Sequence, residues 1–297
     1  VAEVISVARD LNVLLHISHL KCVGKNNWGH LLKESINLIN INISRGMKIT
    51  YDVYPCTAGS SQLVQILPPE FLEGGLDKTT MRLKNPDLRR KCREILEKPQ
   101  SYFENQVYLI GWENIVVTSL NLAEHEHFIG KSISEIAGMT NCDEYEAAFD
   151  LLEKENCDIS MINFIVSEDD IKTIMQSPSS YIISDSIYPD KGMPHPRQYG
   201  SFTKFIQEYV IEQKILSLET AIHKITGGPA KGFKIANKGL LHVGYDADIN
   251  IFNPRKIKNN ATYTDPMRLS EGFSYVIVNG EIINDHDRFT NKPAGRV

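Results

Sequence analysis

The sequence has 297 residues, of which 42% are hydrophobic and 23% are charged, enough apolar material for one large core or two smaller ones. The formal net charge of -5 and the lack of a long basic run argue against nucleic acid or an anionic membrane surface as the main partner. No apolar run approaches the roughly 20 residues that span a bilayer. The five cysteines include no C-x-x-C pair, so a reducing, cytoplasmic location is expected.

The first twelve residues, VAEVISVARDLN, have the pattern of the second half of an amphipathic helix. Residue 1 is Val, and nothing around it resembles a natural start. We therefore expect that an upstream part of the protein lies outside this chain.

The elements that follow predict a βαβ unit. Val13 to His19 is short, apolar and rich in β-formers, as in a strand buried on both faces of a parallel sheet. A helical stretch from about His30 to Ile43 comes next, and a second apolar strand runs from Met47 to Tyr54. Strand, helix and strand at this spacing indicate an α/β fold.

Residues 56–157 are charged and helix-rich, too long for a crossover, and are interpreted as an inserted subdomain. The βα alternation is then expected to resume, with further strands and helices at 158–166, 169–176, 180–184, 201–213 and 216–226. Beyond Gly227 the sequence contains short strand patterns separated by Gly-Tyr-Asp and Asn-Gly turns, which predict a small β domain.

His19 is placed at the end of the first predicted strand. In α/β barrels the carboxyl ends of the strands form the active-site face, so this imidazole is a candidate metal ligand. The alternative is a structural histidine bonded to a backbone carbonyl. Lys21 lies two residues on, and the strand period of two would direct it to the same side.

Asp185 has the same position after the later strand Ser180–Ser184. A carboxylate there can take a proton from an attacking water and return it to a leaving amine. A turn or helix-capping aspartate is the alternative.

Tyr54 and Arg197 are candidate substrate binders. Tyr54 ends the Met47 strand, and Arg197 lies on the loop after Asp185. A guanidinium fork can hold a substrate carboxylate through two hydrogen bonds, and a tyrosine hydroxyl can add a third. A surface arginine that binds nothing remains the commoner case.

The segment His125-Glu126-His127 has the H-x-H spacing by which a strand presents two imidazoles to zinc. No strand pattern surrounds it. We therefore interpret it as a solvated loop or helix end rather than as a metal site.

Five stretches in this order resemble the N-acyl-D-amino-acid deacylases (D-aminoacylases) of the amidohydrolase superfamily. They cover nearly the whole chain and are joined by GKSISEIA at 130–137 in the insertion. The stretches are ISHLKCVGKNNWG at 17–29, YDVYPCTAGSS at 51–61, IISDS at 182–186, HPRQYGSF at 195–202 and GYDADINIFNP at 244–254.

This resemblance implies the C-terminal part of a TIM-like (β/α) metal-dependent hydrolase barrel, with an inserted helical subdomain and a small C-terminal β-sandwich portion. Residues 1–55 would hold barrel strands six and seven with a helix, and 56–157 would form a lid. Residues 158–235 would hold the last barrel strand and helices, and 236–297 the small β domain.

The resemblance also assigns roles to the candidate residues. His19 matches the zinc-ligating histidine of strand six, and Asp185 matches the catalytic acid/base of strand eight. Lys21, Tyr54 and Arg197 match positions that resemble binders of the substrate carboxylate and neighbouring polar groups, and Ser60 joins them.

Two departures from the family pattern are small. Ser186 and Cys56 stand where the family usually has glycine and tyrosine. The larger departure is that the family's other metal ligands precede Val1. A catalytic zinc normally needs three protein ligands, so His19 alone cannot hold it, and we expect the isolated chain to be inactive.

The resemblance implies zinc-dependent hydrolysis of N-acyl-D-amino acids, a small-molecule substrate class, in the complete protein. A cyclic amidohydrolase of the dihydropyrimidinase type is one alternative. A non-catalytic remnant or binding module is another, and a homo-oligomer is an open alternative for the assembly.

Overall fold

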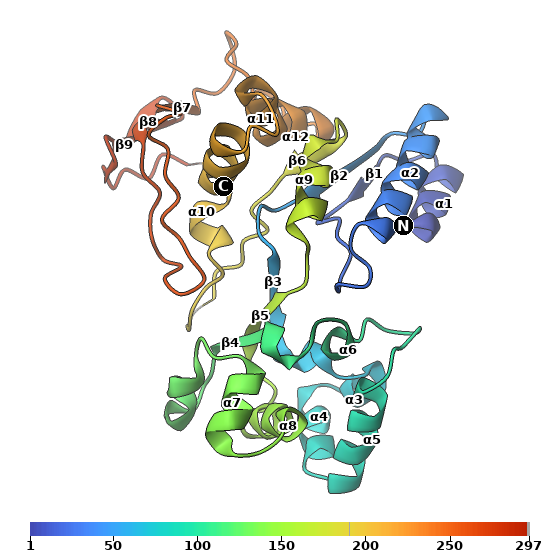
Figure 1. The fold of residues 1–297 in the computed structure, drawn as a ribbon. Coiled ribbons are helices and arrows are strands. Elements are labelled where there is room, and N and C mark those ends of the chain that lie inside the picture. Colours follow the sequence, from blue (N-terminus) through green and yellow to red (C-terminus); the bar gives the residue numbers. More distant parts are fainter. Residues whose placement is uncertain (190, 296–297) are drawn as a thin grey trace.

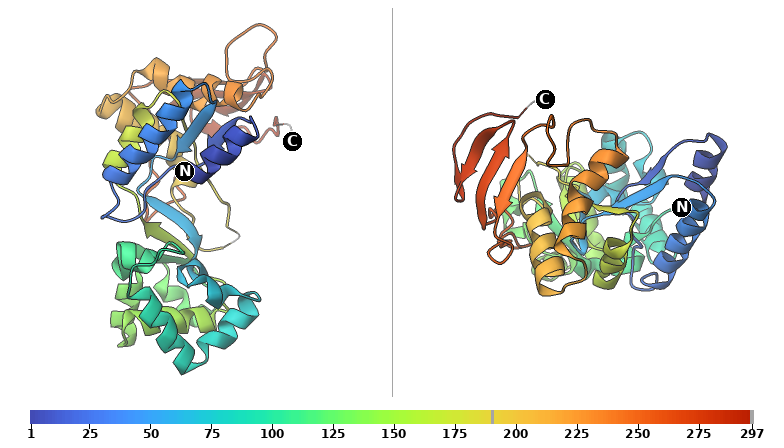
Figure 2. Two further views of the ribbon diagram at one scale, coloured as in Figure 1. Left: turned by 90° about the vertical axis from the view of Figure 1, so that its right-hand side faces the viewer. Right: turned by 90° about the horizontal axis from the view of Figure 1, so that it is seen from above.

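The computed structural model describes residues 1–189 and 191–295, which form two lobes (Figure 1). One lobe holds a parallel sheet with its helices and carries the C-terminal strands at its side. The other holds the insertion. Strands β3 (Ala58–Gln62) and β5 (Ser160–Phe164) run between the two lobes, as the left-hand view of Figure 2 also shows.

Three parallel strands form the first sheet, in the order β1 (Leu15–Ile17), β2 (Ile49–Val53) and β6 (Ser180–Ile182). Tyr51 at the centre of β2 is fully buried. The helices that pack on these strands are α1 (Ala2–Asp10), α2 (His30–Ser44), α9 (Glu168–Gln176) and α11 (Leu218–Ile225). Consecutive parallel strands with covering helices confirm the α/β class.

The remaining segments of this lobe follow β6. Helix α10 (Arg197–Lys204) continues directly into a π-helical segment, η4 (Phe205–Glu212), and α12 (Gly227–Gly232) follows α11. The chain then enters an antiparallel sheet in the order β10-β9-β8-β7. Its strands are β7 (Ile249–Phe252), β8 (Phe273–Val278), β9 (Glu281–Asp285) and β10 (Arg288–Phe289).

The insertion, predicted at residues 56–157, extends through β5 in the structure and contains an antiparallel sheet as well as helices. Its strand order is β3-β5-β4, with β4 at Ile115–Ser119. The α-helices are α3 (Pro69–Leu72), α4 (Leu76–Leu83), α5 (Pro86–Leu96), α6 (Gln106–Ile110), α7 (Ile133–Thr140) and α8 (Glu144–Lys154). Short 3-10 segments are η1 (Leu63–Ile66), η2 (Trp112–Asn114) and η3 (Ala123–Phe128).

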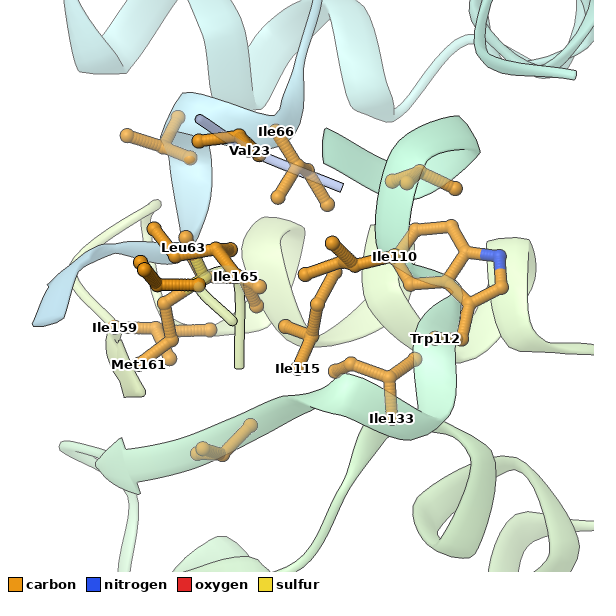
Figure 3. Packing of buried hydrophobic residues seen from close by; sticks show 14 of the residues in the cluster. Val23, Leu63, Ile66, Ile110, Trp112, Ile115, Ile133, Ile159, Met161 and Ile165 are labelled. Carbon is orange, nitrogen blue, oxygen red and sulfur yellow. The ribbon is translucent and has the colours of Figure 1, made fainter. Parts of the chain in front are cut away.

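The insertion has a continuous apolar interior (Figure 3). Leu63, Ile115 and Met161 come from three different elements, and each is fully buried. Val23, from the loop after β1, belongs to the same cluster, so the loop beside the parallel sheet is packed against the insertion.

Two sequence predictions of strands need correction. The predicted 158–166 strand exists as β5, but it pairs antiparallel with β3 and β4 instead of joining the parallel sheet. The first strand was expected to be buried on both faces, yet β1 is only half-buried and shorter than predicted. The left-handed backbone of His19, with φ 38, ends extended geometry at that point.

Among the residues that the structure describes, no helix combines the length and the hydropathy needed to cross a bilayer. All five cysteines lie in the described ranges and are free thiols.

Candidate active site

Three predicted site residues follow the three parallel strands at the same edge of the sheet. His19 comes after β1, Tyr54 directly after β2, and Asp185 after β6. The carboxyl ends of parallel strands meet at one edge, which is why residues so distant in sequence converge. His19 and Asp185 both have left-handed backbone, with φ 38 and 49, where non-glycine residues are uncommon.

A cavity of about 240 Å³ lies at this edge, and five of the six predicted residues line it. They are His19, Lys21, Ser60, Asp185 and Arg197. The side chain of His19 is exposed, whereas Asp185 is half-buried and Arg197 is only 3% exposed.

Arg197 is the cation at the centre of this cavity. Its Nη1 forms an ion pair with Asp185 Oδ2 at 2.9 Å, and its guanidinium carbon lies 4.7 Å from the centroid of the Tyr54 ring. Its Nε is buried without a hydrogen-bond partner in the described part of the chain. A buried donor without a partner is unfavourable for the folded state.

Tyr54 is the sixth predicted residue and forms the wall behind this pair. Burial, opposed in part by Arg197, raises the pKa of its phenol to about 12, so the hydroxyl keeps its proton at neutral pH. Lys21 Nζ donates to Tyr54 Oη at 3.4 Å. Burial lowers the pKa of Lys21, and the nearby carboxylates of Asp185 and Glu104 oppose that shift.

His195 orients Arg197 and was not singled out from the sequence. Its Nε2 donates to the Ala58 carbonyl at 3.0 Å, and its Nδ1 accepts the backbone N–H of Arg197 at 3.0 Å. Burial, followed by the charge of Arg197, lowers the pKa of His195 to about 3, so the ring is neutral. The only sequence signal was its place in the His-Pro-Arg tripeptide.

Asp52 is a second residue that the sequence interpretation missed. It is 4% exposed, accepts a 2.7 Å bond from His16 Nε2, and accepts the backbone N–H of His19. His16 Nδ1 in turn contacts Thr50 Oγ1 at 2.8 Å. Asp52 therefore fixes the backbone at His19. A carboxylate inside an apolar strand was the available signal, because a buried charge needs a partner.

The insertion supplies the other side of the cavity. The sequence offered no signal for these residues, because they belong to segments whose spatial neighbours a pattern does not reveal. They are Ser61, Gln65, Glu104, Gln106 and Asn163. Asn163 is 3% exposed, and its Oδ1 has no partner among the described residues; the same holds for Ser61 Oγ. The wall of the cavity therefore contains polar atoms that are buried without a partner.

Gly59 on β3 permits this close approach. A Cβ at that position would lie 2.7 Å from Asn163 Oδ1 and 3.5 Å from Tyr54 Oη. A side chain at this position would clash with Asn163 and crowd Ile165, whose Cδ1 would lie 3.2 Å from the added Cβ.

The His125-Glu126-His127 segment forms the short helical segment η3, as one of the two sequence interpretations predicts. The prediction that it is solvated is wrong for His125, which is 7% exposed. Its Nδ1 lies 2.6 Å from Oε1 of the buried Glu155, and that carboxylate also accepts the Asn121 backbone N–H at 2.6 Å. His125 is thereby a structural residue.

The described residues do not supply all the ligands that a catalytic zinc ion needs. Within residues 1–189 and 191–295, no three His, Cys, Asp or Glu side chains gather in a way that could hold a metal ion. His19 and Asp185 line the cavity but are two groups where a catalytic zinc normally has three protein ligands. The chain's own residues do not fit a complete zinc site.

Comparison with known proteins agrees with the fold. A model of the amidohydrolase family matches residues 162–284. An N-acyl-D-glutamate deacylase of Alcaligenes xylosoxydans xylosoxydans is 31% identical over 282 residues, which cover 94% of this chain and 47% of that protein. An N-acyl-D-aspartate deacylase of the same organism is 28% identical over 99% of this chain and 49% of its own.

Solved structures of deacylases also match this chain. The crystal structure of a D-aminoacylase described as defining a novel subset of amidohydrolases matches with a TM-score of 0.75 and 27% identity, covering 100% of this chain and 52% of that one. An N-acyl-D-glutamate deacylase from Bordetella bronchiseptica, complexed with zinc and a phosphonate inhibitor, matches with a TM-score of 0.74, 26% identity and coverage of 99% and 50%.

The chain spans about half the length of the relatives it matches, in agreement with the prediction that it corresponds to the C-terminal part of such proteins. The motifs, the parallel strands with their convergent polar residues, and these matches lead to one assignment. The chain is homologous to N-acyl-D-amino-acid deacylases, and its residues 162–284 match the amidohydrolase family.

Proposed function

We propose that the complete protein hydrolyses the amide bond of N-acyl-D-amino acids to a carboxylic acid and a free D-amino acid. The observation that carries the proposal is the ion pair of Asp185 with Arg197 in a cavity that His19 and Lys21 also line. A general acid/base beside a carboxylate binder is the minimum that this substrate needs.

Arg197, Tyr54 and Lys21 bind the substrate carboxylate in this proposal. The guanidinium of Arg197, which lines the cavity, donates to the carboxylate, and the protonated Tyr54 hydroxyl and the Lys21 ammonium add further donors. Ser60 lies on the facing strand β3 and contributes a hydroxyl to the cavity. Fixing the carboxylate on one wall orients the amide bond and selects one hand of the substrate.

Asp185 moves the proton. Its carboxylate accepts a proton from the water that attacks the amide carbonyl, and then transfers that proton to the nitrogen as the carbon–nitrogen bond breaks. The ion pair with Arg197 holds the carboxylate in place before the substrate binds. Zinc belongs to the proposal only for the complete protein, with His19 as one ligand and the other ligands supplied from outside the described residues.

Asp185→Asn in the complete protein tests the proton-transfer role. We expect kcat for N-acetyl-D-amino acids to fall by about a thousandfold or more, because the carboxamide side chain of Asn cannot accept the proton of the attacking water. The fold and the metal content should persist. Near-normal turnover in a folded, metal-loaded Asp185→Asn protein would refute the assignment.

Arg197→Ala separates linear from cyclic amides. Cyclic imides carry no free carboxylate, so the loss of kcat/KM should be large for N-acetyl-D-amino acids and small for a cyclic imide. The reverse order of losses would favour a cyclic amidohydrolase.

A further inference from the structure

Glu104 is the one acidic residue that the insertion contributes to the candidate active site. It is an exposed side chain on the loop before α6, and its charge acts on Lys21 across the cavity. The described residues contain no ion-pair partner for it within salt-bridge distance. Its carboxylate is therefore open to a cationic ligand.

Hydrogen bonds on both sides hold Glu104 at this position. The neighbouring Asn105 is 2% exposed and donates from Nδ2 to the carbonyls of Leu96 and Lys98, both at 2.9 Å. On the other side, Gln106 Oε1 accepts from Asn163 Nδ2 at 2.8 Å, and Gln106 Nε2 donates to Glu104 Oε1 at 3.4 Å. The loop is anchored to α5 and to β5, so the carboxylate has a defined place.

A second cavity of about 300 Å³ shares Glu104 with the first as a lining residue. Its lining combines apolar or aromatic side chains with amides and has no basic residue among those described. It includes Val23, Phe103, Tyr108, Leu109, Asn27 and Gln100. An aliphatic chain fits the apolar wall, and a terminal cation fits a carboxylate beside aromatic rings.

A substrate with an acidic side chain would find no free cation to pair with among the described residues of these two cavities. The cations of the first cavity are Lys21 and Arg197, and Arg197 is already paired with Asp185. Binding the substrate's α-carboxylate uses these cations, so a second carboxylate would face Glu104 without a counter-charge. This differs from the acidic substrates named for the two Alcaligenes relatives.

We propose that Glu104 determines specificity and that the second cavity takes the cationic side chain of an N-acyl-D-amino acid such as acylated D-lysine or D-arginine. This inference rests on the proposed deacylase function. Glu104 makes an ion pair with the side-chain cation, while the α-carboxylate stays with Arg197, Tyr54 and Lys21.

The test compares Nα-acetyl-D-lysine with Nα-acetyl-D-norleucine, which has the same carbon chain without the ammonium group, in the complete metal-loaded protein. We expect kcat/KM to favour the lysine derivative by about 10- to 100-fold, and Glu104→Gln to remove most of that preference by lowering the lysine value more than the norleucine value. Glu94→Gln, which removes an exposed carboxylate on α5, is the matched control and should preserve the preference.

The outcomes separate this inference from the proposed function. Hydrolysis of the norleucine derivative without a preference for lysine would overturn the role of Glu104 and leave the deacylase assignment standing. Equal losses for both substrates in Glu104→Gln would also overturn it, since Glu104 would then act only through Lys21. No hydrolysis of any N-acetyl-D-amino acid would overturn both.

Discussion

The two residues with central proposed roles, His19 and Asp185, share an unusual backbone conformation. Each has positive φ within three residues of the end of a parallel strand, where a side chain raises the conformational energy. Polar contacts hold both in place: Asp52 accepts the backbone N–H of His19, and Arg197 forms an ion pair with the carboxylate of Asp185. The chain thus stores strain at the positions to which the proposed chemistry is assigned.

His195 gives a prediction at the same scale. Its folded-state pKa of about 3 lies below its ordinary value of 6.5, so the unfolded chain binds a proton first as the pH falls. Its stabilising contribution is therefore complete above pH 6.5 and is lost progressively towards pH 3, at about 1.4 kcal/mol per pH unit.

His195→Gln retains a donor for Ala58 without a titrating ring. We expect the fall in unfolding free energy between about pH 7.5 and 5.5 to be smaller by about 1 kcal/mol in this variant than in the unmodified protein. Urea unfolding at both pH values measures the difference. The exposed His127→Gln is the control and should keep the full pH dependence; an unchanged dependence in His195→Gln would contradict the prediction.

At the scale of elements, Asp52 ties β2 to β1. It accepts bonds from His16 on β1 and from the backbone after β1, in a sheet where β1 has only one described neighbour. Asp52→Ala leaves both donors without their acceptor, and we expect a loss of about 3 kcal/mol of unfolding free energy. Asp52→Asn keeps one acceptor and should lose about half as much.

Chemical denaturation distinguishes these two variants. Asp10→Ala, which removes an exposed aspartate on α1, should change the unfolding free energy by less than about 0.5 kcal/mol. Equal stability of Asp52→Ala and Asp10→Ala would contradict a tie between the strands.

The elements also show what the sequence could and could not predict. Apolar runs and their spacing located β1, β2 and β6 and the helices between them, because local patterns determine which segments are strands. They did not assign β5 to its sheet. The hydrophobic pattern of a strand does not reveal which other strand it will pair with. In this chain β5 pairs with β3, from which about a hundred residues separate it in the sequence.

The whole molecule explains why the candidate site was only partly predictable. His19 and Asp185 were identified because the carboxyl ends of parallel strands share one edge of a sheet, and the family resemblance supported Lys21 and Arg197 and added Ser60; all five line one cavity. His195 and Asp52 act through neighbours, and Glu104, Gln106 and Asn163 reach the cavity only through the packing of the insertion. No local spacing encodes such contacts, so the structure was needed to identify them.

The last prediction concerns the metal in the chain by itself. His19 lies beside Asp185 without a third ligand in the described residues, and the nearby Asp52 is already bonded to His16. We therefore expect the isolated chain, dialysed after incubation with zinc, to retain less than about one zinc per chain and to show no hydrolysis of N-acetyl-D-amino acids. Elemental analysis of the chain and of His19→Ala measures the difference that this imidazole makes, which should be small. A full equivalent of zinc that disappears in His19→Ala, together with hydrolysis, would mean that the chain completes the metal site with residues of its own, and the proposed dependence on outside ligands would be wrong.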